Sequence, residues 1–380
     1  MFRTSQIIDP PIVEIKKKLV GLCDEKKLIN LSQAVPSYPM PGRIKQELTG
    51  NFSDAFSFYT PDQGLDELRE AICTLHNVDG VKIDPSQVMI SAGANQGAFS
   101  VFTVLFNAGD KVALPVPYYF NYDMALKMLG VEPVYYFLEE GKGFKFDFKS
   151  FDKSIFEKCK AVVVISPNNP TGAEYDIEEL KLLYAECVRQ GVTLISDEAY
   201  GFFSQGGYPA TSLLTHVNSL DKLVVINTFS KTFSLTGFRV GYTIAKENLI
   251  KEIMKVQDTV IICAPRISQI AALTGLKHCS VWLDEKAHMI KENVDEFTKL
   301  FAEASTSYKL ASCGNFFAYL KHPYEDKTAE EVAFMLAEKK NIITLPGSIF
   351  GPKQERFIRL AFGNLQGKDQ ILQLVERLKE

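Results

Sequence analysis

The chain has 380 residues, of which 46% are hydrophobic and 23% are charged, as in folded globular proteins and unlike disordered or fibrous ones. At roughly 150 residues per domain, this length predicts two packed domains. The 42 Lys and Arg against 46 Asp and Glu leave a formal net charge of −4. A net negative charge does not attract the phosphate backbone of a nucleic acid, so we expect no nucleic-acid partner.

The sequence shows no pattern typical of membrane insertion, secretion, disulfide bonds or metal binding. The longest nearly apolar stretch, residues 98–106, is about half as long as a membrane-spanning helix, and no secretory signal opens the chain. We therefore expect a cytoplasmic protein without a membrane partner. The seven cysteines lack a Cys-x-x-Cys pair and the five histidines show no ligand spacing, which favours reduced thiols and no metal.

The first forty or so residues are rich in Pro and show no clear periodicity after Asn30. They are too few to form a domain alone. We expect them to lie against the C-terminal part of the chain.

Residues 88–226 alternate between short apolar runs and segments of helical period. We expect strands at 88–90, 111–116, 161–165, 192–195 and 223–226, and helices near 96–106, 121–129 and 180–188. Nearly continuous apolar strands that alternate with amphipathic helices are typical of a parallel sheet covered on both faces. The predicted fold class is therefore α/β.

The pattern changes near residue 280. A long charged helix is expected at 282–304, and Thr328 to Glu331 form a capping box that opens another helix. Strands are expected at 316–320, 342–345 and 357–361. We therefore predict a large domain at 46–279, with a mainly parallel sheet between helices, and a smaller α+β domain formed by residues 1–45 and 280–380.

Ligands of open parallel sheets bind beyond the carboxyl ends of the strands. After the first predicted strand, Gly93, Ala94 and Asn95 open a helix whose free N–H groups and dipole suit an anion, although every helix start has such donors. After the second strand, a group of tyrosines is either a stacking platform or a set of loop anchors: Tyr118, Tyr119 and Tyr122.

The other three strand ends carry polar residues as well. Asn169 to Gly172 would by itself be read as a turn. Asp197 and Glu198 follow a buried strand directly, so at least one carboxylate needs a cationic partner. The last end carries Thr228, Ser230 and Lys231 and then Arg239. Lysines are usually solvated, but Lys231 has Phe229, Phe233 and Leu235 close by in the sequence.

An aromatic platform, a buried carboxylate, a buried lysine and an anion cradle together suit a flat, phosphorylated, cationic heterocycle with an aldehyde, which is pyridoxal 5′-phosphate (PLP). The whole chain also resembles the class I/II aminotransferases, which are fold-type-I PLP enzymes. The motifs that match are residues 30–33, 59–64, 169–172 and 196–200, Ser230-Lys231, Arg239 and Arg359. Residues 93–96 and 117–122 look most like a branch that includes aromatic aminotransferases able to use methionine.

PLP chemistry and the resemblance together imply roles for the central residues. Lys231 would bind the cofactor covalently and move protons, which requires that its pKa fall from about 10.4. Asp197 would keep the pyridine nitrogen protonated. By resemblance, Asn169 and Tyr200 hydrogen-bond the phenolic oxygen of the cofactor, and Tyr119 stacks on its ring.

The remaining assignments concern the phosphate and the substrate. We expect the phosphate to be bound by Gly93, Ala94, Asn95, Thr228, Ser230 and Arg239. The resemblance implies a homodimer in which Tyr59 of the neighbouring subunit joins this set. Arg359 would grip the substrate α-carboxylate, because a planar fork is bidentate and always charged; alone it would equally be a surface residue. Asn169 and Ala34 are also placed at the substrate, although many relatives have Gly where Ala34 stands.

A carboxylate held beside the ring leaves the Cα–H bond free to react, which predicts a transaminase that works by a ping-pong mechanism. A β-eliminating or ring-forming PLP lyase shares the same residues and stays open, whereas a non-catalytic regulator would need an additional N-terminal domain. Aspartate-preferring relatives carry Lys where Asn95 stands, so we expect an aromatic or other neutral amino acid as substrate. The alternative is an aspartate or broad-range enzyme. Tyr38, Phe350 and the tyrosines near 118–122 are candidates for the side-chain pocket.

Overall fold

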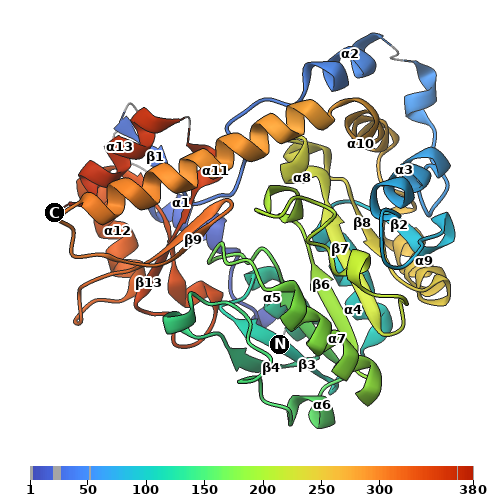
Figure 1. The fold of residues 1–380 in the computed structure, drawn as a ribbon, viewed down its shortest axis with the longest axis horizontal. Coiled ribbons are helices and arrows are strands. Elements are labelled where there is room, and N and C mark those ends of the chain that lie inside the picture. Colours follow the sequence, from blue (N-terminus) through green and yellow to red (C-terminus); the bar gives the residue numbers. More distant parts are fainter. Residues whose placement is uncertain (1–2, 20–26, 51–52, 366, 380) are drawn as a thin grey trace.

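The computed structural model describes residues 3–19, 27–50, 53–365 and 367–379. Its larger sheet has seven strands in the order β2-β8-β7-β6-β5-β3-β4 (Figure 1). Their bounds are β2 (Val88–Ser91), β3 (Lys111–Val116), β4 (Glu132–Phe137), β5 (Ala161–Ile165), β6 (Thr193–Asp197), β7 (Leu223–Thr228) and β8 (Gly241–Ile244). All pairs are parallel except the two that include β8. The α/β prediction is confirmed, with one antiparallel strand inside the sheet.

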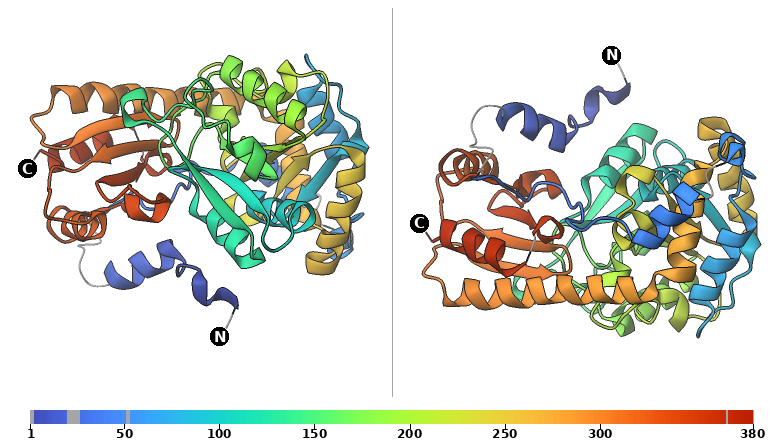
Figure 2. Two further views of the ribbon diagram at one scale, coloured as in Figure 1. Left: turned by 90° about the horizontal axis from the view of Figure 1, so that it is seen from below. Right: turned by 90° about the horizontal axis from the view of Figure 1, so that it is seen from above.

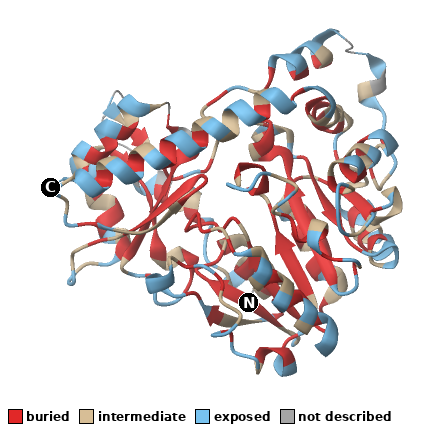
Figure 3. Cartoon of the chain, viewed as in Figure 1, coloured by how far each residue is buried: buried red, intermediate tan, exposed pale blue. Residues whose placement is uncertain are grey.

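The central strands are buried on both faces, as their apolar runs predict. Every residue of β5 is buried, and Figure 3 shows the neighbouring strands buried in the same way. Because successive side chains point to opposite faces, Val162 and Val164 join one core cluster while Val163 and Ile165 join the other.

Helices cover both faces of this sheet. One core cluster contains side chains of α4 (Ala94–Leu105), α5 (Phe120–Leu129) and α9 (Glu247–Ile261). The other contains those of α3 (Asp66–His76), α7 (Ile177–Gln190) and α10 (Arg266–His278). The shorter helices are α2 (Gly42–Gly50), α6 (Ile155–Lys158) and α8 (Phe229–Thr232).

A four-stranded antiparallel sheet, ordered β12-β13-β10-β9, lies in the C-terminal part. Its strands are β9 (Lys309–Gly314), β10 (Phe317–Lys321), β12 (Leu345–Pro346) and β13 (Phe357–Ala361), and its helices are α11 (Ser280–Glu303), α12 (Ala329–Lys340) and α13 (Lys368–Arg377). The Thr328 capping box is confirmed. In Figure 1, α11 runs from this part to the helices beside the larger sheet.

The single strand predicted at 342–345 is wrong. The segment divides into β11 (Ile342–Ile343) and β12 because the two halves bond to different strands. β11 pairs in parallel with β1 (Ile29–Asn30), whereas β12 pairs with β13.

The N-terminal segment follows the prediction only in part. β1 joins the C-terminal part through β11, and α1 (Pro11–Leu19) contacts α12 (Figure 2). The short 3-10 helix Arg3–Gln6 instead contacts α5, beside the larger sheet. The domain boundaries at 45/46 and 279/280 stay a prediction. Within the described residues, no helix is long and apolar enough to cross a membrane.

Candidate active site

The five strand ends singled out in the sequence meet at one edge of the larger sheet. β8 is antiparallel to both β2 and β7, so β2 runs in the same direction as β3, β5, β6 and β7. A cavity of about 340 Å³ lies at this edge. Of the predicted site residues, it is lined by Ala34, Ala94, Asn95, Tyr119, Asn169, Asp197, Tyr200, Thr228, Ser230, Lys231, Arg239 and Arg359.

Lys231 belongs to the short helix α8, directly after β7. The hydroxyl of Thr228 caps this helix by accepting the N–H of Ser230 at 3.1 Å, which fixes the turn that carries the lysine. Burial lowers the pKa of Lys231 to about 8, and the nearby charges of Arg239 and Arg359 act in the same direction. The amine therefore loses its proton far more readily than a solvated lysine does, as its predicted role requires.

Asp197 ends β6 and is 5% exposed. Its Oδ1 accepts the N–H of Ala199 at 3.0 Å and its Oδ2 accepts the hydroxyl of Tyr122 at 2.7 Å. Burial raises the pKa of Asp197, and these two hydrogen bonds lower it in part. The cationic partner expected from the sequence is not a protein side chain, because no Lys or Arg among the described residues forms an ion pair with Asp197.

Residues of the predicted anion cradle lie together beside α8 and the start of α4. Gly93 precedes α4 with a φ of 81°, and a Cβ there would lie 2.4 Å from Nη2 of Arg239. Nη1 of Arg239 donates to Oγ of Ser230 at 3.4 Å, and the Thr228 hydroxyl donates to the same oxygen at 2.9 Å. Gly93 does not line the cavity itself; the absence of its side chain leaves room for Arg239.

Arg359 extends from β13 and is 2% exposed. Its Nη1 donates to Oδ1 of Asn169 at 3.0 Å, and its Nη2 donates to the carbonyl of Ser32. The guanidinium lies over the rings of Phe317 and Phe350, while its buried Nε has no hydrogen-bond partner among the described residues. Burial lowers the pKa of Arg359 to about 10, so the side chain stays charged at neutral pH.

Tyr119 is held by two amide side chains. Its hydroxyl accepts Nδ2 of Asn121 at 2.8 Å and Nδ2 of Asn95 at 3.3 Å. These bonds fix the phenol at the cavity wall, and burial raises the pKa of Tyr119, so it stays protonated.

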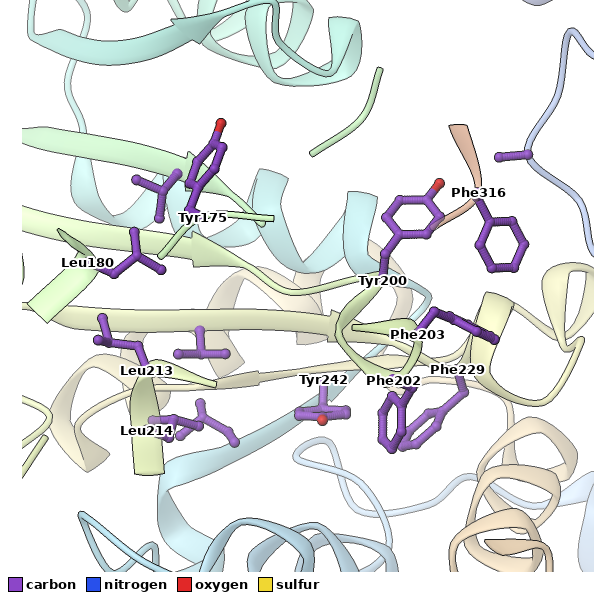
Figure 4. Close-up of a cluster of buried hydrophobic side chains, with 14 of the residues drawn as sticks. Tyr175, Leu180, Tyr200, Phe202, Phe203, Leu213, Leu214, Phe229, Tyr242 and Phe316 are labelled. Carbon is purple, nitrogen blue, oxygen red and sulfur yellow. The ribbon is translucent and has the colours of Figure 1, made fainter. Parts of the chain in front are cut away.

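Tyr200 also lines the cavity and is 6% exposed. Its ring packs against Phe317, with centroids 5.0 Å apart, and against Phe316 at 5.5 Å. Figure 4 shows Tyr200 beside Phe316, above Phe203. Burial raises the pKa of Tyr200, although the charge of Arg359 opposes this effect.

Several predicted residues lie away from the cavity. Tyr59 is 72% exposed and does not line the cavity of its own chain; its carbonyl accepts Nη2 of Arg266 at 2.8 Å. Tyr38, Phe350 and Tyr118 are buried in the core and do not line it either.

Sequence reasoning missed other residues at this site. Ile12, Gln33 and Phe120 line the cavity, and Asn121 bonds to Tyr119, which also lines it. Tyr122, which the sequence offered as a stacking residue or a loop anchor, bonds to Asp197 instead. The polarity of residues 118–122 pointed to this loop, but nothing in the sequence separates the hydrogen-bonding members from the packing ones.

The donor set fits PLP. A buried carboxylate without a protein cation suits a protonated ring nitrogen. Arg239 and the adjoining hydroxyls suit a phosphate, in a space that a side chain at position 93 would crowd. The unpartnered Nε of Arg359 shows spare donor capacity for an anion. These are the features of a fold-type-I PLP enzyme.

Comparisons with known proteins agree. The family profile "Aminotransferase class I and II" matches residues 26–378. The chain is 29% identical over 386 residues to a "Probable aspartate/prephenate aminotransferase" of Aquifex aeolicus, covering 100% of this chain and 97% of the relative. It is 30% identical over 381 residues to a "(5-formylfuran-3-yl)methyl phosphate transaminase" of Methanocaldococcus jannaschii, with the same coverage.

Among solved structures, substrate-bound BacF from Bacillus subtilis aligns with a TM-score of 0.90 at 26% identity, covering 99% of this chain and 96% of that one. The chain belongs to the class I and II aminotransferases. It is a PLP-dependent transaminase that acts on amino acids and 2-oxo acids.

Proposed function

We propose that this enzyme moves the amino group of an aromatic or other neutral L-amino acid to a 2-oxo acid by a ping-pong mechanism. The observation that carries the substrate class is the charge of the cavity wall. Its cations are Lys231, Arg239 and Arg359, and each already has a proposed task. Among the described lining residues no further cation is left for a second substrate carboxylate.

Asn95 supports the same conclusion. It stands where aspartate-preferring relatives have Lys, and its amide donates to the Tyr119 hydroxyl instead of carrying charge. Ile12, Val35 and Phe120 add apolar surface to the cavity, which suits a neutral side chain.

The proposed roles of the other residues follow from their positions. When bound, PLP supplies an electron sink for negative charge at the substrate Cα. Arg359 binds the α-carboxylate, and Asn169 fixes its guanidinium. Nζ of Lys231 would take the proton from Cα and deliver it to the cofactor carbon that carried the aldehyde, because its lowered pKa lets it act as base and then as acid near neutral pH. Asp197 holds the ring nitrogen protonated.

The remaining proposed contacts surround the cofactor. Asn169 and Tyr200 would bond its phenolic oxygen, and Tyr119 would lie on its ring. The start of α4, through Ala94 and Asn95, would bind the phosphate together with Arg239 and its neighbouring hydroxyls.

We also propose a homodimer whose partner supplies Tyr59 to this site. Phe58 and Tyr59 are adjacent large side chains that are 67% and 72% exposed, and Arg266 fixes their backbone through both carbonyls. A held but exposed aromatic pair suits an interface. The cytoplasmic location stays a prediction from the sequence.

The test is a panel of amino donors, aromatic, aliphatic, sulfur-containing and acidic, with pyruvate, 2-oxoglutarate and phenylpyruvate as acceptors, followed by keto-acid formation. We expect aromatic or other neutral donors to give the highest kcat/KM. Activity confined to aspartate and 2-oxoglutarate would contradict the proposal.

A matched pair of variants sharpens this test. Asn95→Lys adds a cation to the cavity wall and should raise the kcat/KM for aspartate relative to phenylalanine. Asn95→Ala removes the same amide without adding charge and should leave that ratio unchanged.

An aspartate or broad-range specificity is the second candidate, favoured by the aspartate/prephenate name of the Aquifex aeolicus relative. It predicts comparable kcat/KM values for aspartate and for aromatic donors in the unmodified enzyme. The same panel therefore separates the two candidates.

A further inference from the structure

The roles proposed above do not use the buried hydroxyl of Tyr122, which lies beside the site. Tyr122 lies on α5, is 2% exposed and does not line the cavity. Its hydroxyl donates to Oδ2 of Asp197 at 2.7 Å, across 75 positions of sequence. Burial and the charge of Asp197 raise the pKa of Tyr122 well above its usual range, so the phenol keeps its proton and acts as the donor.

Packing leaves the Tyr122 ring little freedom. It meets Phe102 edge-on, with centroids 5.5 Å apart, and Tyr119 at 5.8 Å. Tyr119 precedes α5 and Tyr122 lies in its first turn. One helix start therefore presents one tyrosine to the cavity and the other to the carboxylate of Asp197, which lines the cavity.

The surroundings of Asp197 make this bond important. Besides the Tyr122 hydroxyl, the only hydrogen-bond donor to the Asp197 carboxylate among the described residues is the N–H of Ala199. Tyr119 and Tyr200 are near the pair and are kept protonated by burial. The charged side chains that line the same cavity as Asp197 are Lys231, Arg239 and Arg359. A carboxylate accepts about four hydrogen bonds, so Asp197 keeps acceptor capacity for a ligand while two donors stabilise its charge.

We propose that Tyr122 is a positioning residue that keeps Asp197 ionised and fixed toward the cofactor, so that the proton shared with the ring nitrogen stays on the nitrogen. This inference rests on the proposed role of Asp197. Two arrangements compete: a carboxylate beside a protonated nitrogen, and a carboxylic acid beside a neutral nitrogen. A hydrogen bond donated to the carboxyl group is stronger when that group is ionised, so it stabilises the first arrangement more than the second.

The test variant is Tyr122→Phe, which removes one oxygen from the holoenzyme. Its first readout is the ¹⁵N resonance of ¹⁵N-labelled PLP, which distinguishes a protonated from a neutral ring nitrogen. The second is a pH titration of the absorbance of the cofactor bound to Lys231. A positive ring nitrogen lowers the midpoint of that titration. We expect Tyr122→Phe to raise it by about half a pH unit, a threefold change in the equilibrium, and to move the resonance toward the neutral position.

Tyr136→Phe is the matched control. Tyr136 is also buried, and its hydroxyl also makes one bond, to the carbonyl of Val163 at 2.7 Å. This variant loses a buried hydrogen bond of the same kind away from the cavity, so neither readout should move. Equal changes in both variants would overturn the inference.

Asp197→Asn separates the possible failures. Asp197→Asn should change the ¹⁵N resonance and the titration midpoint more than Tyr122→Phe does. The double variant with both substitutions should give the same two values as Asp197→Asn alone, because Tyr122 acts through the carboxylate. If Asp197→Asn moves the readouts and Tyr122→Phe does not, the inference fails and the role of Asp197 stands. If Asp197→Asn moves neither, the role of Asp197 fails and the inference falls with it.

A second variant covers the case in which Tyr122→Phe does not fold. Placing 3-fluorotyrosine at position 122 keeps the ring and makes its hydroxyl a stronger donor. The titration midpoint should then move down, opposite to the change expected for phenylalanine. An upward movement, or none, would overturn the inference.

Discussion

Arg359 and Asn169 are 190 positions apart in the chain, yet Nη1 of the arginine donates to the side-chain oxygen of the asparagine at 3.0 Å. The asparagine belongs to a loop after β5 and the arginine to β13, so one bond joins the two sheets at the cavity. It fixes the plane of the guanidinium before any substrate arrives.

Replacing Arg359 by Leu should therefore raise KM for the amino acid by about a hundredfold, because two hydrogen bonds from a charged donor, each worth about 1.5 kcal/mol, are lost. The affinity for PLP should change little. Steady-state kinetics and a cofactor titration measure the two effects. Arg356→Leu is the control, because Arg356 bonds to the carbonyl of His322 and does not line the cavity. Loss of bound PLP in Arg359→Leu would contradict the assignment.

Removing the cofactor tests the lowered pKa of Lys231 and its covalent binding of PLP. Burial and the two nearby arginines lower its pKa to about 8, and only the neutral amine attacks an aldehyde. In enzyme stripped of PLP, the rate of covalent capture should therefore rise with pH, with a midpoint near 8. Arg359→Leu removes one positive charge and should move that midpoint upward. Stopped-flow absorbance measures the rate, and borohydride reduction with peptide mapping identifies the lysine. A label on another lysine would refute the site.

Gly93→Ala should weaken PLP binding by tenfold or more, because the new Cβ would lie 2.4 Å from Nη2 of Arg239 and would displace it; about 1.4 kcal/mol accounts for tenfold. Gly109→Ala is the matched control. Its φ of 90° also disfavours a side chain, but a Cβ there meets nothing within 4 Å. Both variants should lose some stability in urea unfolding, and only Gly93→Ala should lose affinity for PLP. Equal affinities would show that the space beside Arg239 is not needed.

Glu198 should make folding stability depend on pH. Burial raises the pKa of its carboxyl from 4.5 to about 7, so between these values the folded protein holds this proton more firmly than the unfolded chain does. Stability from this group is therefore full at low pH and falls as pH rises toward 7, by up to about 1.4 kcal/mol per pH unit. Glu198→Gln should flatten that slope. Urea unfolding from about pH 5 to 8 measures it, and identical slopes in both proteins would contradict the assignment.

Much of the larger sheet could be predicted from the sequence because buried parallel strands have a distinctive composition. β5, with the sequence AVVVI, is apolar throughout and needs no knowledge of its neighbours. β4 escaped prediction because it is a partly exposed edge strand that contains Pro133. β8 is only four residues long and begins at Gly241, so it lacks the signals of a strand.

The features of the site also divide into those that could be predicted from the sequence and those that could not. Residues that follow strands, such as Asp197 and Lys231, could be placed because the sheet dictates where strand ends go. The contact between Tyr122 and Asp197 could not, since it depends on how α5 packs against the sheet. Burial of the Asp197 carboxylate was likewise predictable, but its two hydrogen-bond donors, the Tyr122 hydroxyl and the N–H of Ala199, were not.

The pairing of β1 with β11 joins Ile29 and Asn30 to Ile342 and Ile343, and Nη1 of Arg377 adds a bond to the carbonyl of Lys27. A ribosome makes the first of these segments more than three hundred positions before the second. During synthesis, β1 must therefore wait without its partner while the more than three hundred intervening residues are made, so this corner of the enzyme forms later than its first strand.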